Sequence, residues 1–292
     1  MSIHSDQEKF RSGSRRREWK IITAPSGWPS LEIRELFDYK DLLLFLVLRD
    51  IKVLYKQTIL GFGWAIIRPL FSMLIFTVVF GKIAQVSSDG VPYAVFSYVA
   101  LVPWTYFSSS VSASATSLIA QVDVLTKVYF PRLIFPAAPV LSNLLDFAIA
   151  LSLTGGFLLW YGIAPTSNIV FLPLLVAMMM LTAGGFGMWL SALAIQYRDV
   201  KHATNFMTQL LMYAAPVVWP VSALTDRFGE TVRVLYGLYP MAGVIEGFRS
   251  ALLGTNPMPW DLIISGFLSA VLIFVTGALY FKRMERRFVD VA

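Results

Sequence analysis

Cysteine is absent from this chain of 292 residues, and histidine occurs only as His4 and His202. The lack of cysteine excludes disulfides and thiolate chemistry, and two histidines so far apart argue against a histidine-based metal site. The chain also lacks a GxxxxGK(S/T) phosphate-binding loop, so we expect no nucleotide to bind in that manner. The sequence therefore predicts no catalytic residues, no metal site and no cofactor on this chain. Energy for any transport would come from another polypeptide.

Charged residues are also scarce. They make up 14% of the chain against 57% hydrophobic residues, and the mean hydropathy is +0.65. These values lie outside the usual balance of soluble globular domains and indicate an all-α integral membrane protein. The net charge is +6, but most Lys and Arg residues fall in connections on one predicted side of the membrane. That pattern indicates topology and contact with membrane lipids, not a nucleic-acid surface.

Six segments are long and apolar enough to cross a membrane. They lie at Phe62–Phe80, Tyr93–Ile119, Pro139–Tyr161, Ile169–Ile195, Phe206–Ala223 and Leu262–Phe281, and together form a six-span domain over residues 59–292. Basic residues gather before the first segment and after the second, fourth and sixth, whereas the short connections on the other side carry few. By the positive-inside rule both termini are cytoplasmic, which requires an even number of spans.

Two regions precede the first span. Residues 1–30 combine basic side chains with Ser, Gly and Pro, a composition that predicts a mobile cytoplasmic tail. Residues 31–58 contain an apolar run of seven residues, Leu42–Leu48, which is too short to cross a hydrocarbon core that needs about 20 residues. We therefore expect an amphipathic helix along the inner leaflet. It joins the first span through an elbow at Gly61 and Gly63, which is either a hinge or a simple bend.

The connection over residues 226–259 is long and mostly apolar, with charges spaced through it. Its conspicuous residues are Tyr239, Pro240, Glu246 and Arg249. Non-helical backbone at membrane depth is tolerated only where protein buries it or water lines it. We therefore expect a pair of short re-entrant helices in the outer half of the membrane, beside a partly wet cavity. The alternative is a surface loop with one amphipathic helix.

Arg68 in the first span and Asp146 in the third are charges inside predicted membrane segments. An unpaired charge costs at least about 2.5–3.5 kcal/mol at mid-bilayer, so such residues tend to face the bundle interior and find partners. Arg68 either faces the bundle interior and finds a partner there, or its side chain extends to the lipid headgroups of the inner leaflet. For Asp146 we expect an ion pair with Arg68 or Arg198. A proton relay would need further ionisable groups at similar depth, and the sequence offers none.

Hydroxyl side chains crowd the second half of the second predicted span. They are Ser108, Ser109, Ser110, Ser112, Ser114, Thr116 and Ser117. Small hydroxyl residues let helices pack closely, which is their usual role in membranes. They would also suit a polar path for a sugar-bearing substrate, and the sequence does not separate these two interpretations.

Four motifs, in order along the chain, resemble one protein family. They are Leu48–Leu70 (LRDIKVLYKQTILGFGWAIIRPL), Asp123–Pro136 (DVLTKVYFPRLIFP), Ile195–Ala203 (IQYRDVKHA) and Tyr239–Gly254 (YPMAGVIEGFRSALLG). Together they look like the permease subunits of type-2 ABC exporters for cell-surface polysaccharides, the group that moves O-antigen, capsule and teichoic-acid chains. The resemblance runs from about residue 31 to residue 287.

The resemblance implies a homodimer in the bacterial inner membrane that pairs with two copies of a separate ABC ATPase, which would hold ATP and Mg²⁺. The implied substrate is a lipid-linked polysaccharide, most simply of the O-antigen type. In such permeases a short coupling helix after the second span seats in the ATPase. Here that helix would cover about residues 121–136, with Asp123, Lys127, Tyr129 and Arg132 as its expected contacts.

The resemblance also implies that the helix break around residues 239–246 is the family's outer gate. It implies a channel between the two subunits as well, lined by the first, second and fifth spans. Aromatic residues on those spans would stack on sugar rings, and the candidates are Trp64, Phe71, Trp104, Tyr106 and Tyr213. Aromatic residues also populate ordinary membrane-interface belts, so this assignment is the least specific one.

Two other functions are open at this stage. A permease of the same broad fold would expel drugs or small lipids. A membrane-embedded transferase acting on a lipid-linked sugar would need Asp146 or Glu246 as an essential acid or base. The lack of an acid/base cluster counts against the transferase.

Overall fold

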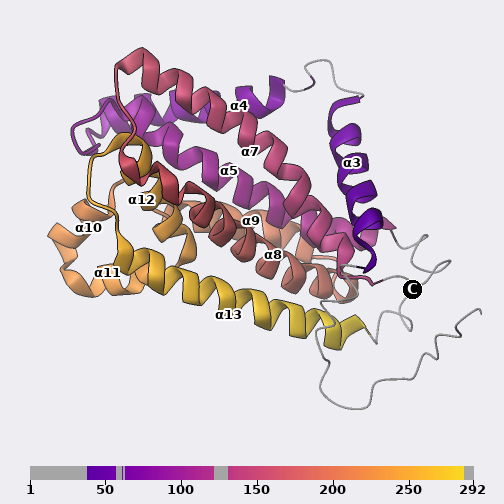
Figure 1. The fold of residues 1–292 in the computed structure, drawn as a ribbon. Coiled ribbons are helices and arrows are strands. Elements are labelled where there is room, and N and C mark those ends of the chain that lie inside the picture. The colour runs from indigo at the N-terminus through magenta and orange to yellow at the C-terminus, as the bar shows by residue number, and fades with distance from the viewer. Residues whose placement is uncertain (1–37, 57–60, 62, 122–130, 286–292) are drawn as a thin grey trace, which may run out of the picture. The chain divides into compact units, whose positions relative to one another are not determined.

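A computed structural model describes residues 38–56, 61, 63–121 and 131–285, and the ordered elements in these ranges are helices. They are α3 (Lys40–Lys56), α4 (Gly63–Phe76), η1 (Thr77–Ile83), α5 (Tyr93–Ser117), η2 (Ile119–Gln121), α7 (Ile134–Tyr161), η3 (Ser167–Phe171), α8 (Leu172–Gln196), α9 (Val200–Ala214), α10 (Val221–Phe228), α11 (Glu230–Gly237), α12 (Pro240–Leu253) and α13 (Trp260–Glu285). The predicted tail, residues 1–30, lies outside the described residues. Figure 1 shows the helices as a bundle with α10, α11 and α12 at one end and α3 at the other.

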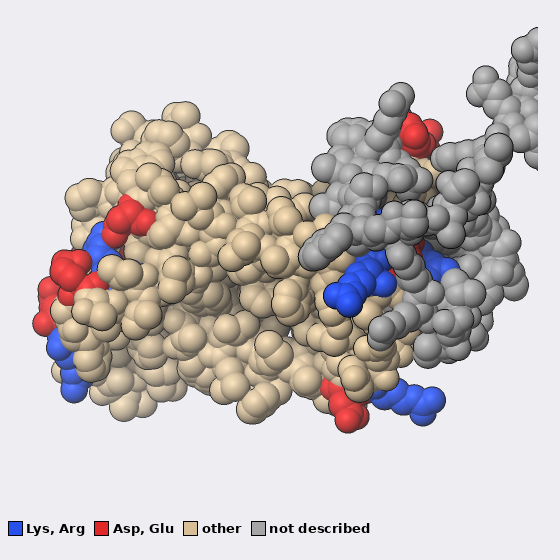
Figure 2. Space-filling view, turned by 90° about the horizontal axis from the view of Figure 1, so that it is seen from below, with Lys and Arg blue, Asp and Glu red and all other residues tan. Residues whose placement is uncertain are grey.

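Four helical stretches are long and apolar enough to cross a membrane within the described part of the chain. They are Gly63–Ile83, Ile134–Tyr161, Ser167–Gln196 and Trp260–Glu285, and they coincide with the predicted first, third, fourth and sixth spans. On the face shown in Figure 2, charged side chains gather at the two ends and the surface between them carries none. This distribution is expected where a hydrocarbon layer surrounds the middle of the bundle.

Helix α5 is the element around which the bundle is built. It packs against α4, α7, α8, α9 and α12, and most of its residues are buried. Ser114 donates a hydrogen bond to the Pro136 carbonyl at 2.8 Å, and a Cβ atom at Gly187 of α8 would lie 2.6 Å from Ser114 Cβ. At these positions the hydroxyl residues therefore serve close helix packing.

The predicted fifth span, Phe206–Ala223, is wrong as a continuous helix because α9 ends at Ala214. Its 15 residues span about 22 Å, which is short of a hydrocarbon core of about 30 Å. Pro216 causes the break, since proline has no N–H and forces the preceding Ala215 into an extended conformation (ψ 150°). The chain from Ala215 to Pro220 then continues without regular structure until α10 begins.

Helices α11 and α12 form a hairpin that packs against the first turns of α13. A Cβ atom at Gly237 would meet Ser265 Oγ at 2.5 Å, and one at Gly243 would meet the Leu262 carbonyl oxygen at 2.6 Å. The chain thus runs alongside α13 on α11 and returns on α12. Every residue of α12 is buried, so this part of the connection does not lie on the surface of the subunit.

Helix α3 lies within the predicted interfacial region, residues 31–58. Figure 1 shows it at a steep angle to α5 and α7, crossing the end of the bundle. Leu46 is buried in a small apolar cluster that includes Leu118 and Phe281, while several other apolar residues of α3 are exposed. Arg49 donates a hydrogen bond to Gln121 at 2.9 Å, so α3 is tied to the segment that follows α5.

Helices α8 and α13 approach most closely at two glycines. A Cβ atom at Gly277 would lie 2.5 Å from the Gly185 carbonyl oxygen, and one at Gly185 would lie 2.8 Å from the Ile273 backbone. The ring of Trp189 stacks on Tyr280 beside this crossing, with centroids 5.5 Å apart. Glycine is required here because the two backbones touch.

The first span does not end as a regular helix. After Phe76 it widens into the π-helix η1, and the Ala84 N–H donates to the Val79 carbonyl, five residues back, at 2.9 Å. A π-helical turn holds one more residue than an α-helical turn, and such segments recur at functional sites.

Candidate functional site

Glu246 and Arg249 of α12 form a buried ion pair at the break between α9 and α10. Arg249 Nη1 lies 2.8 Å from Glu246 Oε1, and the side chains are only 1% and 8% exposed. The two residues are three apart on the helix, which brings both side chains to one face. A buried pair of this kind is stable only if further hydrogen bonds satisfy both groups.

Most of those hydrogen bonds come from the backbone of the break, and only Nε of the Arg249 guanidinium has no hydrogen-bond partner in the described part of the chain. Arg249 Nη2 donates to the Val217 carbonyl at 2.9 Å, and Nη1 approaches the Trp219 carbonyl at 3.4 Å. The Val221 N–H donates to Glu246 Oε1 at 3.3 Å. Backbone groups without partners cost several kcal/mol at membrane depth. The pair therefore stabilises the non-helical chain, and we call Glu246 and Arg249 with their backbone partners the helix-break clamp.

Two aromatic residues of α5 complete the clamp. The Tyr93 hydroxyl donates to the Val218 carbonyl at 2.7 Å, and the Arg249 guanidinium lies 3.6 Å from the centroid of the Phe96 ring. Such a cation–π contact contributes about 2 kcal/mol or more when it is shielded from water. Glu246 and Arg249 were identified from the sequence, but Tyr93 and Phe96 were not, because they lie about 150 positions away in the chain. Pro216 and Pro220 were the signal for the break.

The predicted gate residues Tyr239 and Pro240 lie at the turn between α11 and α12. Pro240 begins α12, and the Tyr239 hydroxyl lies 3.4 Å from the Leu211 carbonyl of α9. On the outer side of this turn, Arg233 Nη2 donates to Asp261 Oδ1 at 2.9 Å while its Nε donates to Oδ2. This hydrogen bonding raises the pKa of Arg233 and fixes α11 to the start of α13.

Asp89 joins three segments of the chain at the same end of the bundle. Ser222 Oγ donates to Asp89 Oδ1 at 3.2 Å, and Asn256 Nδ2 donates to Oδ2 at 2.7 Å. Asp89 adopts a left-handed backbone conformation (φ 52°), which Asp tolerates better than most residues. This Asp89 cluster ties the turn after η1 to α10 and to the connection before α13.

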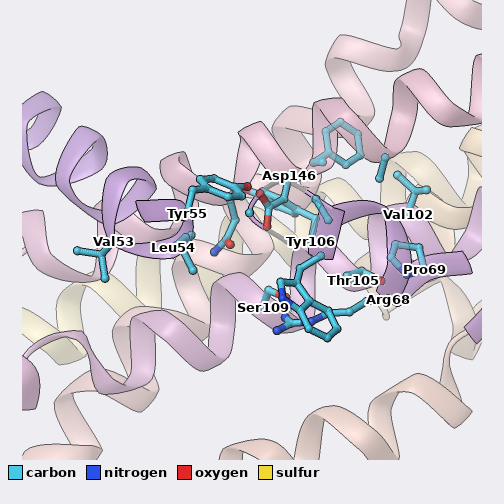
Figure 3. A pocket seen from close by; sticks show the side chains of 16 residues that line it. Val53, Leu54, Tyr55, Arg68, Pro69, Val102, Thr105, Tyr106, Ser109 and Asp146 are labelled. Atoms are coloured by element: carbon cyan, nitrogen blue, oxygen red, sulfur yellow. The ribbon is translucent and has the colours of Figure 1, made fainter. Parts of the chain in front are cut away.

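A cavity of about 330 Å³ opens between α3, α4, α5 and α7, and we call it the lateral cavity. It is lined by Val53, Leu54, Tyr55, Gly61, Trp64, Ala65, Arg68, Pro69, Val102, Thr105, Tyr106, Ser109, Asn143, Asp146, Phe147 and Ala150. Figure 3 shows Asp146 and Tyr55 on one side and Arg68 with Ser109 on the other. The structure thus brings Arg68, Asp146 and the Gly61 elbow to one place.

The ion pair expected for Asp146 is not formed with Arg68 or Arg198 among the described residues. Asp146 Oδ1 is buried and accepts no hydrogen bond within the described part of the chain. Arg68 is exposed, and its guanidinium lies 5.7 Å from the centroid of the Trp64 ring. The prediction fails because the two charges stand on opposite walls of the lateral cavity.

The five aromatic residues predicted to line a channel fall into two groups. Trp64, Phe71 and Tyr213 are 43%, 63% and 54% exposed on the subunit. Trp104 is buried and packs on Phe107, so its assignment to a channel is wrong. Tyr106 is also buried, and its hydroxyl donates to the Val140 carbonyl at 2.8 Å, although its ring borders the lateral cavity.

Comparison with known proteins decides the family. A family model described as ABC-2 type transporter matches residues 41–253. The chain belongs to the ABC-2 type transporter family. The matched residues extend from the first turn of α3 to the last residue of α12. They include both the helix-break clamp and the lateral cavity.

Curated relatives of this ABC-2 transporter chain are similar over nearly their whole length. The O-antigen export system permease protein RfbA of Myxococcus xanthus is 29% identical over 254 residues, covering 87% of this chain and 96% of the relative. A protein of the same name from Klebsiella pneumoniae is 25% identical over 86% and 95% of the two chains. The polysialic acid transport protein KpsM of Escherichia coli is 22% identical over 82% and 92%.

The residues predicted to couple this ABC-2 transporter chain to an ATPase are only partly described. Asp123, Lys127 and Tyr129 lie outside the described residues. Arg132 donates a hydrogen bond to the Glu285 carbonyl at 2.9 Å and so ties the start of α7 to the end of α13. The predicted coupling helix, residues 121–136, overlaps α7, which already begins at Ile134.

The Gly61 elbow supports a direct test. Gly61 has a left-handed backbone (φ 47°), and no atom of the described residues lies within 4 Å of a Cβ built there. Gly61→Ala is therefore expected to lower the free energy of unfolding by about 1–2 kcal/mol through backbone strain alone. Thermal unfolding in detergent micelles measures the change. Gly156→Ala, in an exposed helical position with open space around it, is the control, and equal behaviour of the two variants would contradict the strain.

Proposed function

We propose that this chain is the transmembrane subunit of an ATP-driven exporter that moves a lipid-linked polysaccharide of the O-antigen type across the bacterial inner membrane. The observation that supports it most is the similarity to O-antigen export permeases, which covers 87% of this chain and 96% of the Myxococcus xanthus relative. The family assignment agrees with a permease whose ATPase is a separate chain. The nucleotide and Mg²⁺ are then held by that partner.

The proposed topology has six crossings with both termini in the cytoplasm. Four crossings are the long apolar helices described above, and α5 is a fifth, polar enough to need burial inside the bundle. The sixth is α9 completed by the irregular chain up to Pro220. The hairpin of α11 and α12 is then a re-entrant outer gate, because it enters beside α13 and returns to the same end.

The proposed assembly is a homodimer that binds two ATPase subunits. Helices α4 and α9 both pack on α5 but leave large apolar side chains exposed. These include Phe71, Leu74 and Ile75 on α4, and Phe206, Leu210 and Tyr213 on α9. Either lipid or a second subunit covers such faces in a membrane, and a substrate path between two subunits places Trp64, Phe71 and Tyr213 along it.

In the proposed mechanism the ATPases act on the end of the bundle that holds α3. Movement of the segment after α5 is transmitted to α3 through the Arg49–Gln121 hydrogen bond. The same movement is transmitted along α5 to the outer gate. The far end of α5 carries Tyr93 and Phe96, which contact the helix-break clamp. One rigid helix thus connects the ATPase side to the gate.

The decisive experiment is deletion of the gene in its host, followed by analysis of surface glycan. We expect complete loss of surface polysaccharide together with accumulation of the lipid-linked form inside the cell, and recovery of both when the gene is restored. Unchanged surface glycan with new sensitivity to toxic compounds would instead indicate a drug or small-lipid permease. Turnover of a lipid-linked sugar by the purified chain without an ATPase would indicate a transferase.

A further inference from the structure

The lateral cavity presents two opposite charges that do not neutralise each other. Asp146 Oδ1 is buried without a hydrogen-bond donor in the described part of the chain, and Arg68 faces the same space from the other wall. Buried carboxylate oxygens without donors are costly, and charged residues inside membranes usually mark a partner or a ligand path. A ligand that supplies a donor to Asp146 and an acceptor to Arg68 would satisfy both.

The chemistry of the walls selects a zwitterion. A purely anionic ligand would be attracted by Arg68 but repelled by Asp146. A purely cationic ligand would be attracted by Asp146 but repelled by Arg68. A phosphate beside Arg68 and an ammonium beside Asp146 match both charges through charge-assisted hydrogen bonds. Because Asp146 needs an N–H donor, a primary ammonium fits and a quaternary ammonium does not.

The surroundings of the cavity suit the body of a lipid. Its wall on α3 belongs to a helix that crosses the end of the bundle, where headgroups are expected. Arg68 lies on α4, whose next turns expose Phe71, Leu74 and Ile75 and offer an apolar track for an acyl chain. The volume of about 330 Å³ lies at the lower end of the usual range for small-molecule sites, about 300–1,000 Å³.

We propose that the lateral cavity binds the headgroup of a phospholipid that carries both a phosphate and a primary ammonium group. Arg68 holds the phosphate and Asp146 the ammonium, and the acyl chains lie along α4. The bound lipid joins α3 and the Gly61 elbow to α4 and α7. This site is independent of the exported substrate, so it stands or fails separately from the proposed function.

A headgroup series on the unmodified protein tests the proposal first. Purified protein in detergent is offered equal amounts of phosphatidylethanolamine and one competitor, which is its N-methyl, N,N-dimethyl or N,N,N-trimethyl (phosphatidylcholine) form or phosphatidylglycerol. Native mass spectrometry measures the ratio of the two bound lipids. We expect the N-methyl and N,N-dimethyl forms, which keep an N–H donor, to compete better than phosphatidylcholine, which has none. The preference for phosphatidylethanolamine over phosphatidylcholine is expected to be about tenfold, the effect of one charge-assisted hydrogen bond. Equal binding across the series would overturn the proposal.

Variants then assign the residues. In Asp146→Asn, the ratio of bound phosphatidylethanolamine to bound phosphatidylcholine should fall close to one. Asp146→Glu should retain much of the preference for phosphatidylethanolamine. Arg68→Gln should weaken both lipids about tenfold without changing their ratio. Arg233→Gln and Asp261→Asn remove the same charges from an exposed pair and serve as matched controls, with no change expected.

Two outcomes contradict the assignment. A preference that survives in Asp146→Asn would show that the ammonium group binds elsewhere. Thermal stabilisation of the unmodified protein by a free hexose or amino sugar, lost in Asp146→Asn and accompanied by equal binding of all phospholipids, would make the cavity a sugar site instead.

Discussion

Arg249→Met is expected to lower the free energy of unfolding by about 3–5 kcal/mol, the range found when one partner of a buried ion pair is removed. The substitution leaves the Glu246 carboxylate unpaired and removes the donors to the Val217 and Trp219 carbonyls. It also removes the cation above the Phe96 ring. Methionine fills much of the same volume, so the loss reflects missing donors more than a cavity.

Unfolding in mixed micelles of a mild detergent and sodium dodecyl sulfate measures this change. Arg233→Met is the matched control, because its pair with Asp261 is partly exposed and is expected to contribute less than about 1 kcal/mol. Glu246→Gln combined with Arg249→Met should recover part of the loss by removing the unpaired charge. If Arg249→Met were as mild as the control, the backbone of the helix break would not depend on the clamp.

Gly277→Ala is expected to destabilise the fold by about 2–3 kcal/mol, a cost typical of an overpacked core. Its new Cβ atom would lie 2.5 Å from the Gly185 carbonyl oxygen, which is backbone and cannot rotate away. Helices α8 and α13 would have to separate, and the Trp189–Tyr280 stack beside the crossing would shift with them.

The same unfolding assay measures this change, with Gly155→Ala as the control. Gly155 lies on an exposed part of α7 with nothing within 4 Å of a Cβ built there, so the added methyl group is expected to be neutral or stabilising by up to about 1 kcal/mol. A Gly277→Ala variant as stable as Gly155→Ala would mean that the two helices are not held at this distance.

The spans that the sequence predicted well are those whose apolar run is uninterrupted. Helix α13 covers the charge-free run Leu262–Phe281, and α8 covers the predicted fourth span with small differences at the ends. The fifth span failed because Phe206–Ala223 is mostly apolar and carries no charged residue, and hydropathy does not register that Pro216 removes a backbone donor. The irregular chain there is apolar in its side chains and polar only in its backbone.

The candidate site was predictable in its charges and not in its geometry. Glu246, Arg249, Arg68 and Asp146 stood out because charge is rare in apolar sequence, and the structure places each at a buried pair or at a cavity wall. Their partners did not stand out. Tyr93 and Phe96 belong to a helix without an amphipathic pattern, so no periodicity tells which face meets α12. Trp104 was assigned to a channel because the resemblance placed the second span there, and the lack of periodicity gave no sign that this side chain is buried.

The π-helical winding of η1 sets the direction in which the chain leaves the first of the long apolar helices. If the seven residues Thr77–Ile83 wound as an ordinary α-helix, each turn would hold fewer residues, and the chain after the segment would leave at a different angle around the helix axis. Asp89 would then no longer face Ser222 and Asn256, whose hydrogen bonds tie the turn after η1 to α10 and to the connection before α13. The winding of this one short stretch therefore determines whether these three segments meet.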